Sequence, residues 1–167
     1  MKKSIFLIAI LGVFTMANAD EELKQPFSKG EVNPYSKFFT GTTYLHNMSD
    51  GNDALHISIA NVSFEPCART DWHYHSGGQI LLVSAGSGLF QEEGKTAEII
   101  ETGDVVKIAP NKKHWHGGGA KTMMAHISVM PNDPENKTTW LEKVSDEEYQ
   151  KAVETAIKHQ NNPKLEK

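Results

Sequence analysis

Two pairs of histidines, each with one residue between its members, are the residues of this chain best suited to chemistry. His73 and His75 form one pair, and His114 and His116 form the other. Residues i and i+2 of a β-strand point to the same face of the sheet, so each pair would present two imidazoles to one side. One such pair alone is usually a surface or core feature. Two pairs in one β-rich segment, each followed by glycine, favour a metal site.

Further polar residues lie where they could complete such a site. Gln79 follows His75 across the glycine-rich turn Ser76-Gly77-Gly78, which could bring its side chain back toward the pair, and His126 lies on the next strand-like segment. In a small barrel, inward-facing side chains of several strands converge on one interior point. Three imidazoles and a carbonyl or carboxylate oxygen suit a divalent first-row ion such as Mn, Fe, Ni, Cu or Zn.

Short β-prone runs separated by turn signals occupy the middle of the chain and must position these residues. Strands of about five residues at this close spacing favour an all-β sandwich or barrel over βαβ units. The run Gln79–Ser84 is expected to end at the glycines of Ala85-Gly86-Ser87-Gly88. The other expected strands are Thr40–Leu45, Leu55–Phe64, Trp72–His75, Leu89–Gln91, Thr96–Ile100, Val105–Ile108, His114–His116 and Thr122–Met130.

The end of the chain has a different pattern. Ser145 followed by Glu148 is a capping-box signature, and apolar residues then recur at helical spacing. We expect one amphipathic helix from Asp146 to His159. The predicted organisation is an extended arm over residues 20–37, a β-barrel over 38–144, and a helix with a short tail over 145–167.

The first 19 residues have the features of a secretory signal peptide. Lys2 and Lys3 precede an apolar run from Ile5 to Phe14, and Ala17-Asn18-Ala19 provides a small-residue cleavage site. A membrane anchor is the alternative, but the run is short and acidic residues follow at once. We therefore expect a periplasmic or secreted protein that begins near Asp20 and has no stable membrane insertion after cleavage.

Composition limits the remaining classes of function. The chain of 167 residues has a net charge of -4 without a cluster of basic residues, which argues against nucleic acid as a partner. Its single cysteine, Cys67, cannot form an intramolecular disulfide and is interpreted as a small buried apolar residue. Stability must then come from the core, a bound metal or a partner subunit.

The histidine segments resemble the two conserved motifs of the cupin superfamily. The run ARTDWHYHSGGQ from Ala68 to Gln79 is similar to the first motif, G(X)5HXH(X)3-4E(X)6G, and Gly103 to His114 is similar to the second. Together with the later runs GDVV and KHWHG, the pattern resembles the manganese-dependent bacterial hydroxynitrile lyases and cupins related to carboxymuconolactone decarboxylase proteins. The resemblance extends from Phe38 to Tyr149. Cys67 and Asn111 stand where the pattern has glycine.

The resemblance implies a fold, a cofactor and an assembly. The fold is an all-β double-stranded β-helix, the jelly-roll cupin barrel, with a C-terminal helix. The cofactor is one divalent metal ion, with Mn favoured and Fe, Ni, Zn or Cu as alternatives. A small molecule is the expected substrate, and the assembly is a homodimer or homotetramer. The residues implied are His73, His75, Gln79 and His114 as metal ligands, and His126, Thr70 and His116 as catalytic groups in the same cavity.

Gln79 decides which chemistry the sequence favours. A glutamate would cancel one charge of the cation, whereas a neutral amide beside neutral imidazoles leaves the double charge intact. This favours Lewis-acid lyase chemistry on a small oxygenated or cyano substrate. A metal-dependent dioxygenase of a small aromatic or enol compound, and an exported metal-binding or ligand-binding protein without activity, are the alternatives.

Overall fold

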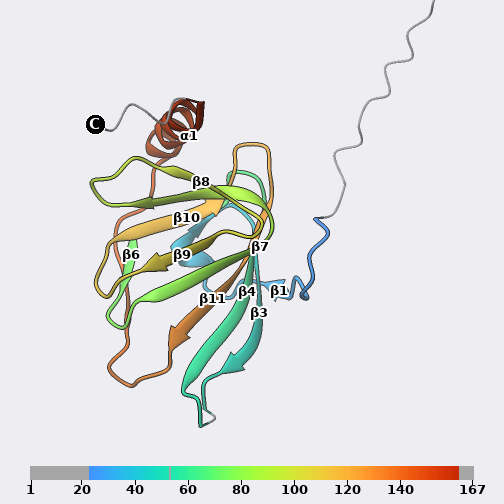
Figure 1. The fold of residues 1–167 in the computed structure, drawn as a ribbon, viewed down its shortest axis with the longest axis vertical. Helices are drawn as coiled ribbons and strands as arrows, with labels where there is room; N and C mark the ends of the chain where they lie inside the picture. Colours follow the sequence, from blue (N-terminus) through green and yellow to red (C-terminus); the bar gives the residue numbers. More distant parts are fainter. Residues whose placement is uncertain (1–22, 53, 162–167) are drawn as a thin grey trace, which may run out of the picture.

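Antiparallel strands joined by turns make up most of the described chain. The computed structural model describes residues 23–52 and 54–161, in which twelve strands form one curled antiparallel sheet with a single α-helix outside it (Figure 1). The all-β jelly-roll barrel with a C-terminal helix is therefore confirmed. The predicted signal peptide and the residues after Asn161 lie outside the described residues.

The curled sheet has two halves. One half contains β1 (Glu31–Val32), β3 (Thr43–Asp50), β4 (Ile57–Phe64), β9 (Val105–Ile108) and β11 (Met124–Pro131). The other contains β2 (Phe39–Thr40), which follows the short helix η1 (Ser36–Phe38), then β5 (Arg69–Thr70), β6 (His73–His75), β8 (Glu98–Glu101), β10 (His114–Gly118) and β12 (Thr138–Trp140). Their inner faces enclose an apolar core that includes Phe64, Leu81 and Met124.

The long strand β7 (Gln79–Glu92) joins the two halves, and here the predicted strand end is wrong. Its first part pairs with β9 and β11, and its second part pairs with β8 and β10. Gly86 bends the strand without ending it, because its φ of +70° and the absence of a Cβ let the Met123 carbonyl come close. The pairing with β11 shifts register next to this point, between Ala125 and His126.

The helix α1 (Asp146–Asn161) covers the outer face of the second half and confirms the helix prediction. Its N-terminus has the expected capping box, since the Ser145 amide donates to Glu148 Oε2 at 2.8 Å and the Glu148 amide donates to Ser145 Oγ at 3.1 Å. Trp72 and Trp115 point outward into the core beneath this helix, as the alternation of a strand requires.

The arm before the barrel is held against the first half. Its strand β1 pairs with β3, Asn61 Nδ2 donates to Gln25 Oε1 at 2.7 Å, and Lys29 forms an ion pair with Glu65 at 3.0 Å. Within the part of the chain that the structure describes, no helix has the length and apolarity needed to cross a bilayer.

Candidate functional site

Five buried histidines from three strands gather inside the barrel. β6 supplies His73 and His75, β10 supplies His114 and His116, and β11 supplies His126, and each side chain is at most 4% exposed. The register of the sheet explains the grouping, because His114 lies directly opposite His73 in the antiparallel pair of β10 with β6. The i, i+2 spacing then turns both pairs to the inner face.

Two of these imidazoles are oriented by backbone carbonyls. His73 Nδ1 lies 2.9 Å from the Asp71 carbonyl oxygen, and His114 Nδ1 lies 2.8 Å from that of Lys112. A carbonyl accepts only, so each Nδ1 carries the proton and donates it. Each Nε2 then presents a lone pair to the cavity, which is the arrangement that metal-ligating histidines adopt.

His75 and Gln79 approach the same point. His75 Nδ1 lies 2.9 Å from Thr138 Oγ1, and its Nε2 is buried without a hydrogen-bond partner among the described residues. Gln79 donates from Nε2 to Ser128 Oγ at 2.9 Å, which turns its amide oxygen to 3.3 Å from His114 Nε2. An unpaired buried nitrogen and an inward amide oxygen are suitable donors for a cation.

Distances between ligand atoms favour a slightly different trio. The potential ligand atoms of His73, His114 and His116 lie within 4.8 Å of one another. His75 is nevertheless as close by ring position, because its centroid is 5.1 Å from that of His73 and 5.6 Å from that of His114. The ring centroid of His116 lies 5.5 Å from that of His73 and 5.9 Å from that of His114. Three buried histidines of this cluster could therefore hold a metal ion.

His116 and His126 form a second pair beside this cluster. His116 Nδ1 and His126 Nε2 lie 3.2 Å apart, so one proton can be shared between them. His116 Nε2 and His126 Nδ1 are buried and lack hydrogen-bond partners within the described structure. Thr70 Oγ1 accepts a hydrogen bond from the His116 backbone N–H at 3.2 Å, which leaves its own proton available to another acceptor. The three expected catalytic residues are thus adjacent.

Burial keeps all of these imidazoles neutral at neutral pH. It lowers the pKa of His126 to about 3 and, helped by the nearby His114, that of His75 to about 4. It also lowers the pKa of His114, and it holds the pKa values of His73 and His116 well below 6.5, with neighbouring imidazoles adding to the effect. The neutral form is the one that ligates a metal or accepts a proton.

Four of the five histidines line one side of a cavity of about 360 Å³: His73, His75, His116 and His126. The other walls come from the arm, β2, β3, β4, β11 and β12, and they include Ala60, which the resemblance also places there. Among the described lining residues there is no Lys, Arg, Asp or Glu. The lining therefore offers no charged side chain of its own to pair with a charged substrate.

Trp140 is a cavity residue that the sequence did not reveal. The sequence pattern does not predict its strand, β12, which pairs with β6 and places Trp140 opposite His73. The indole stacks on Phe38 at 4.7 Å and 6° between planes, and its centroid lies 4.7 Å from that of His73. Asn33 and Tyr35 of the arm also line the cavity. A long loop and an arm bring these residues in, so no local periodicity signals them.

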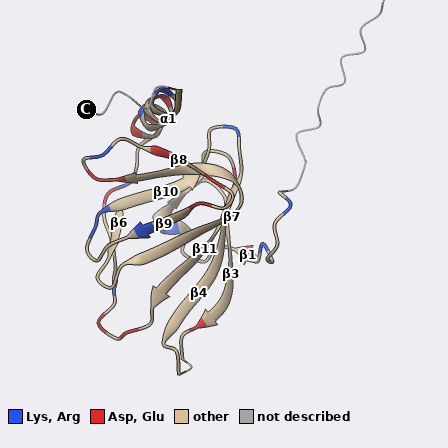
Figure 2. Cartoon of the chain, in the orientation of Figure 1, with Lys and Arg blue, Asp and Glu red and all other residues tan. Residues whose placement is uncertain are grey.

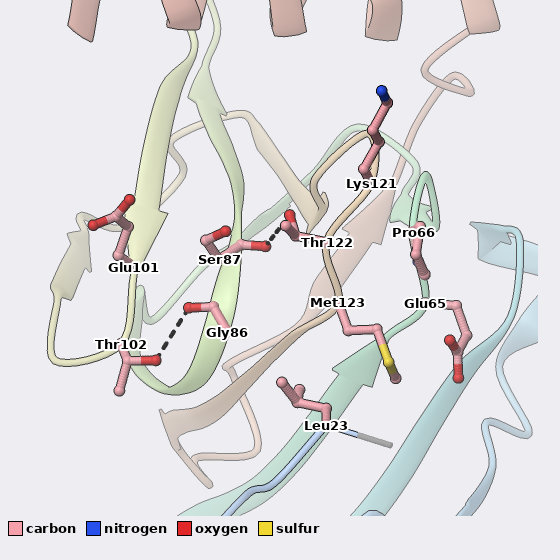
Figure 3. Close-up of a pocket in the computed structure, with 10 residues that line it drawn as sticks. All are labelled: Leu23, Glu65, Pro66, Gly86, Ser87, Glu101, Thr102, Lys121, Thr122 and Met123. Atoms are coloured by element: carbon pink, nitrogen blue, oxygen red, sulfur yellow. Dashed lines mark hydrogen bonds between the residues drawn. The ribbon is translucent and has the colours of Figure 1, made fainter. Parts of the chain in front are cut away.

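A larger hollow of about 700 Å³ lies elsewhere on the barrel and contains none of these histidines (Figure 3). Its walls come from strands β7 and β8 and from neighbouring loops, and hydrogen bonds to main-chain carbonyls of β7 link them. Thr102 Oγ1 donates to Gly86 at 3.1 Å, and Thr122 Oγ1 donates to Ser87 at 3.0 Å. Leu23 at the start of the described arm also borders it. We assign this hollow no part of the chemistry.

Comparison with known proteins places this geometry in a family context. Residues 60–130 match the Cupin_2 family, described as a cupin domain. The chain is 38% identical over 130 residues to an (R)-mandelonitrile lyase of Granulicella tundricola. The aligned region covers 78% of this chain and 99% of that protein.

Solved structures show the same relationship. A cupin-like protein from Thermotoga maritima is 40% identical and superposes with a TM-score of 0.74, over 78% of this chain and 98% of that one. A polyketide cyclase from Streptomyces resistomycificus superposes with a TM-score of 0.55 over 81% of this chain and 93% of that one. At 15% identity, the second structure shows the fold alone.

Proposed function

The chain belongs to the cupin superfamily, and from this premise we propose that it is an exported, metal-dependent lyase acting on a small oxygenated or cyano substrate, as hydroxynitrile lyases do. One observation carries the proposal. His73, His75 and Gln79 share an uncharged cavity with Thr70, His116 and His126, so a potential metal site and a potential proton-transfer pair face the same small volume.

The proposed ligands are His73, His75, Gln79 and His114, around one divalent ion with manganese favoured. The fixed Nδ1 atoms of the histidines, the unpaired Nε2 of His75 and the inward amide oxygen of Gln79 fit such an ion. His114 lies fully buried behind the cavity wall, so it would bind from the interior side. When bound, the ion would supply a Lewis acid of undiminished double charge.

His126, His116 and Thr70 are the proposed catalytic residues. Cleavage of a cyanohydrin removes the hydroxyl proton and breaks the bond between carbon and cyanide, which leaves a carbonyl compound and hydrogen cyanide. His126, joined to His116 at 3.2 Å, would accept the hydroxyl proton and return it to the cyanide. The Thr70 hydroxyl would donate to the substrate oxygen, because its own oxygen already accepts from the His116 N–H.

Turnover of mandelonitrile by manganese-loaded protein tests the proposal. We expect release of benzaldehyde by the wild type and its loss in the His126→Ala variant. The matched control is His46→Ala, because His46 alternates with cavity residues on β3 and faces the other side of the sheet. Absence of cleavage, with no effect of His126→Ala on any activity, would contradict the lyase proposal.

Two further assays on the purified protein distinguish the alternatives. Oxygen consumption by iron-loaded or nickel-loaded protein with an aromatic or enol substrate would identify a dioxygenase. Binding of small molecules without turnover would identify an exported binding protein. Export itself is proposed from the first 19 residues, and the intact mass of the exported protein tests it: a chain that begins near Asp20 supports the proposal, and a retained Met1 contradicts it.

A further inference from the structure

Asn33, in the arm before the barrel, is a cavity residue to which the proposed reaction gives no role. Its N–H donates to the Thr43 carbonyl at 2.9 Å, which continues the ladder between β1 and β3 by one residue. Alternate residues of a strand point to opposite faces. The preceding Val32 accordingly points outward and is 66% exposed, whereas Asn33 points inward, is 2% exposed and lines the cavity.

One hydrogen bond determines which end of the Asn33 amide is free. Its Oδ1 accepts from the Tyr35 backbone N–H at 2.9 Å. A backbone N–H only donates, so the oxygen must lie on that side of the amide and Nδ2 on the other. Nδ2 has no hydrogen-bond partner among the described residues. Buried amide N–H groups in native structures are normally paired, so this donor requires an acceptor from outside the chain.

The other amides of the cavity differ from Asn33. Gln79 Nε2 already donates to Ser128 Oγ at 2.9 Å, and Asn47 is an exposed residue whose amide water can reach. Among the described lining residues, Asn33 is therefore the buried amide with an unused nitrogen. The same lining residues include no Asp or Glu, and the wall strands β4 and β11 are tan throughout in Figure 2. The acceptor must then come with a ligand or with water.

The turn that carries Asn33 is fixed before any ligand binds. Beyond the bond from Tyr35 to Asn33, the Phe38 N–H donates to the Tyr35 carbonyl at 2.9 Å, and the Asp71 N–H donates to the Phe38 carbonyl at 2.9 Å. These bonds attach the turn to the barrel on both sides. A donor that is already held in place loses little conformational freedom when a ligand binds, which favours a role in binding.

Aromatic rings connect the proposed metal ligands with this turn. The Trp140 centroid lies 4.7 Å from that of His73 and 5.6 Å from that of Phe39, and its ring stacks on Phe38. Phe39, Trp140 and Tyr35 all line the cavity. Aromatic rings pack well against one another in stacked or edge-on contacts. The wall between the metal ligands and the arm therefore suits a flat aromatic ligand.

We propose that Asn33 Nδ2 donates a hydrogen bond to the substrate. The substrate is then a small aromatic molecule with a neutral oxygen acceptor, such as an ether or a carbonyl, on the part of the ring that faces the arm. Nδ2 is an uncharged donor and no Lys or Arg lines the cavity with it, which favours a neutral oxygen at this position. The inference rests on the proposed function only for the end of the molecule that reacts.

Binding of matched aldehydes tests this subsite without turnover. para-Methoxybenzaldehyde and para-ethylbenzaldehyde have nearly the same shape, but only the first has an ether oxygen, and the meta isomers form a second pair. Isothermal titration calorimetry gives the four dissociation constants. We expect the wild type to bind the methoxy compound of one pair or both about 5-fold to 10-fold more tightly than the ethyl compound.

Two variants remove the donor in different ways. Asn33→Asp at pH 8 keeps an acceptor for the Tyr35 N–H but has no N–H of its own, so the preference for methoxy should be lost. Asn33→Leu removes both polar atoms and should give the same loss, which keeps the test decisive if Asn33→Asp misfolds. The matched control is Asn47→Leu, which should retain the preference. Circular dichroism verifies that each variant is folded.

Three results would overturn the proposal. They are equal binding of the two compounds of both pairs by the wild type, an unchanged preference in folded Asn33→Asp and Asn33→Leu, and a preference that only Asn47→Leu abolishes. Mandelonitrile has no oxygen on its ring, so its cleavage tests the lyase proposal separately. Loss of the methoxy preference in the Asn33 variants supports the subsite whether or not mandelonitrile is cleaved.

Discussion

Replacing Arg69 by Met tests how the C-terminal helix is attached to the barrel. The Arg69 side chain is 3% exposed, and its Nε and Nη2 atoms both donate to the Val144 carbonyl, at 3.0 and 2.9 Å. Nη1 donates to the Cys67 carbonyl at 3.1 Å, and the guanidinium lies 4.8 Å from the centre of the Tyr149 ring. One buried cation thus joins β5 to the residues that begin α1.

The magnitude follows from these contacts. Met fills much of the same volume but leaves the Val144 and Cys67 carbonyls without their donor, which costs about 1–2 kcal/mol for each. The lost cation–π contact adds about 1 kcal/mol. The ion pair with Asp146, at 2.6 Å, adds at most a few tenths of a kcal/mol, because that carboxylate is 91% exposed. We expect a loss of about 3–5 kcal/mol in the free energy of unfolding.

Urea denaturation followed by circular dichroism measures this loss. Asp146→Asn is the control, because it removes the exposed charge and keeps the buried hydrogen bonds, and it should change stability by less than about 1 kcal/mol. Arg69→Lys, which keeps one charge but loses the fork of donors, should lie between the two. A loss below about 1 kcal/mol for Arg69→Met, or an equal loss for Asp146→Asn, would refute this reasoning.

Three further predictions concern pH, a glycine and a left-handed residue. The pKa values of His75 and His126 in the folded protein, about 4 and about 3, lie below the ordinary 6.5, so the unfolded chain takes up protons first. The metal-free protein should therefore keep its full free energy of unfolding above about pH 6.5 and lose it progressively toward pH 4. Urea denaturation in EDTA at a series of pH values should show this decrease, and the decrease should be less steep in His126→Leu. A free energy of unfolding that does not change with pH would contradict the prediction. Gly86→Ala should lower the melting temperature much more than Gly94→Ala. Both glycines have positive φ, but a Cβ at Gly86 would lie 2.1 Å from the Met123 oxygen, whereas a Cβ at Gly94 would meet no atom within 4 Å. Equal decreases in melting temperature would show that the close approach does not matter. Asn111→Val should destabilise the protein by about 1–2 kcal/mol and Asn111→Gly should not, because Asn111 has a φ of 61°. Calorimetry that gives the two variants equal stability would exclude a left-handed backbone conformation at this position.

The sequence predicted those parts of the fold that depend on local patterns. The capping box located the start of α1 at Asp146, period-two alternation located β4, and a short apolar run located β9. The two histidine pairs, His73 with His75 and His114 with His116, point into the interior of the barrel, as their spacing on strands requires. The positive φ of Cys67 and Asn111 gives a physical reason for the glycine that the cupin pattern has at both places.

Other features depend on contacts between distant segments and had no local signal. Gly86 continues β7 because the Met123 carbonyl approaches it from the loop before β11, which the sequence around Gly86 does not reveal. Strand β12 forms only because β6 is beside it, and it places Trp140 against the cavity. The grouping of His116 with His73 and His114 by ligand-atom distance depends in the same way on tertiary geometry.

Metal content of protein purified without added metal tests the central claim most directly. Elemental analysis of the wild type should give one equivalent of a divalent ion, manganese if the favoured identity is right. The ion should be lost in His75→Ala and His114→Ala and retained in His116→Ala, because His75, not His116, is the proposed ligand. A wild type with no stoichiometric metal, or an ion that His75→Ala retains and His116→Ala loses, would contradict the account.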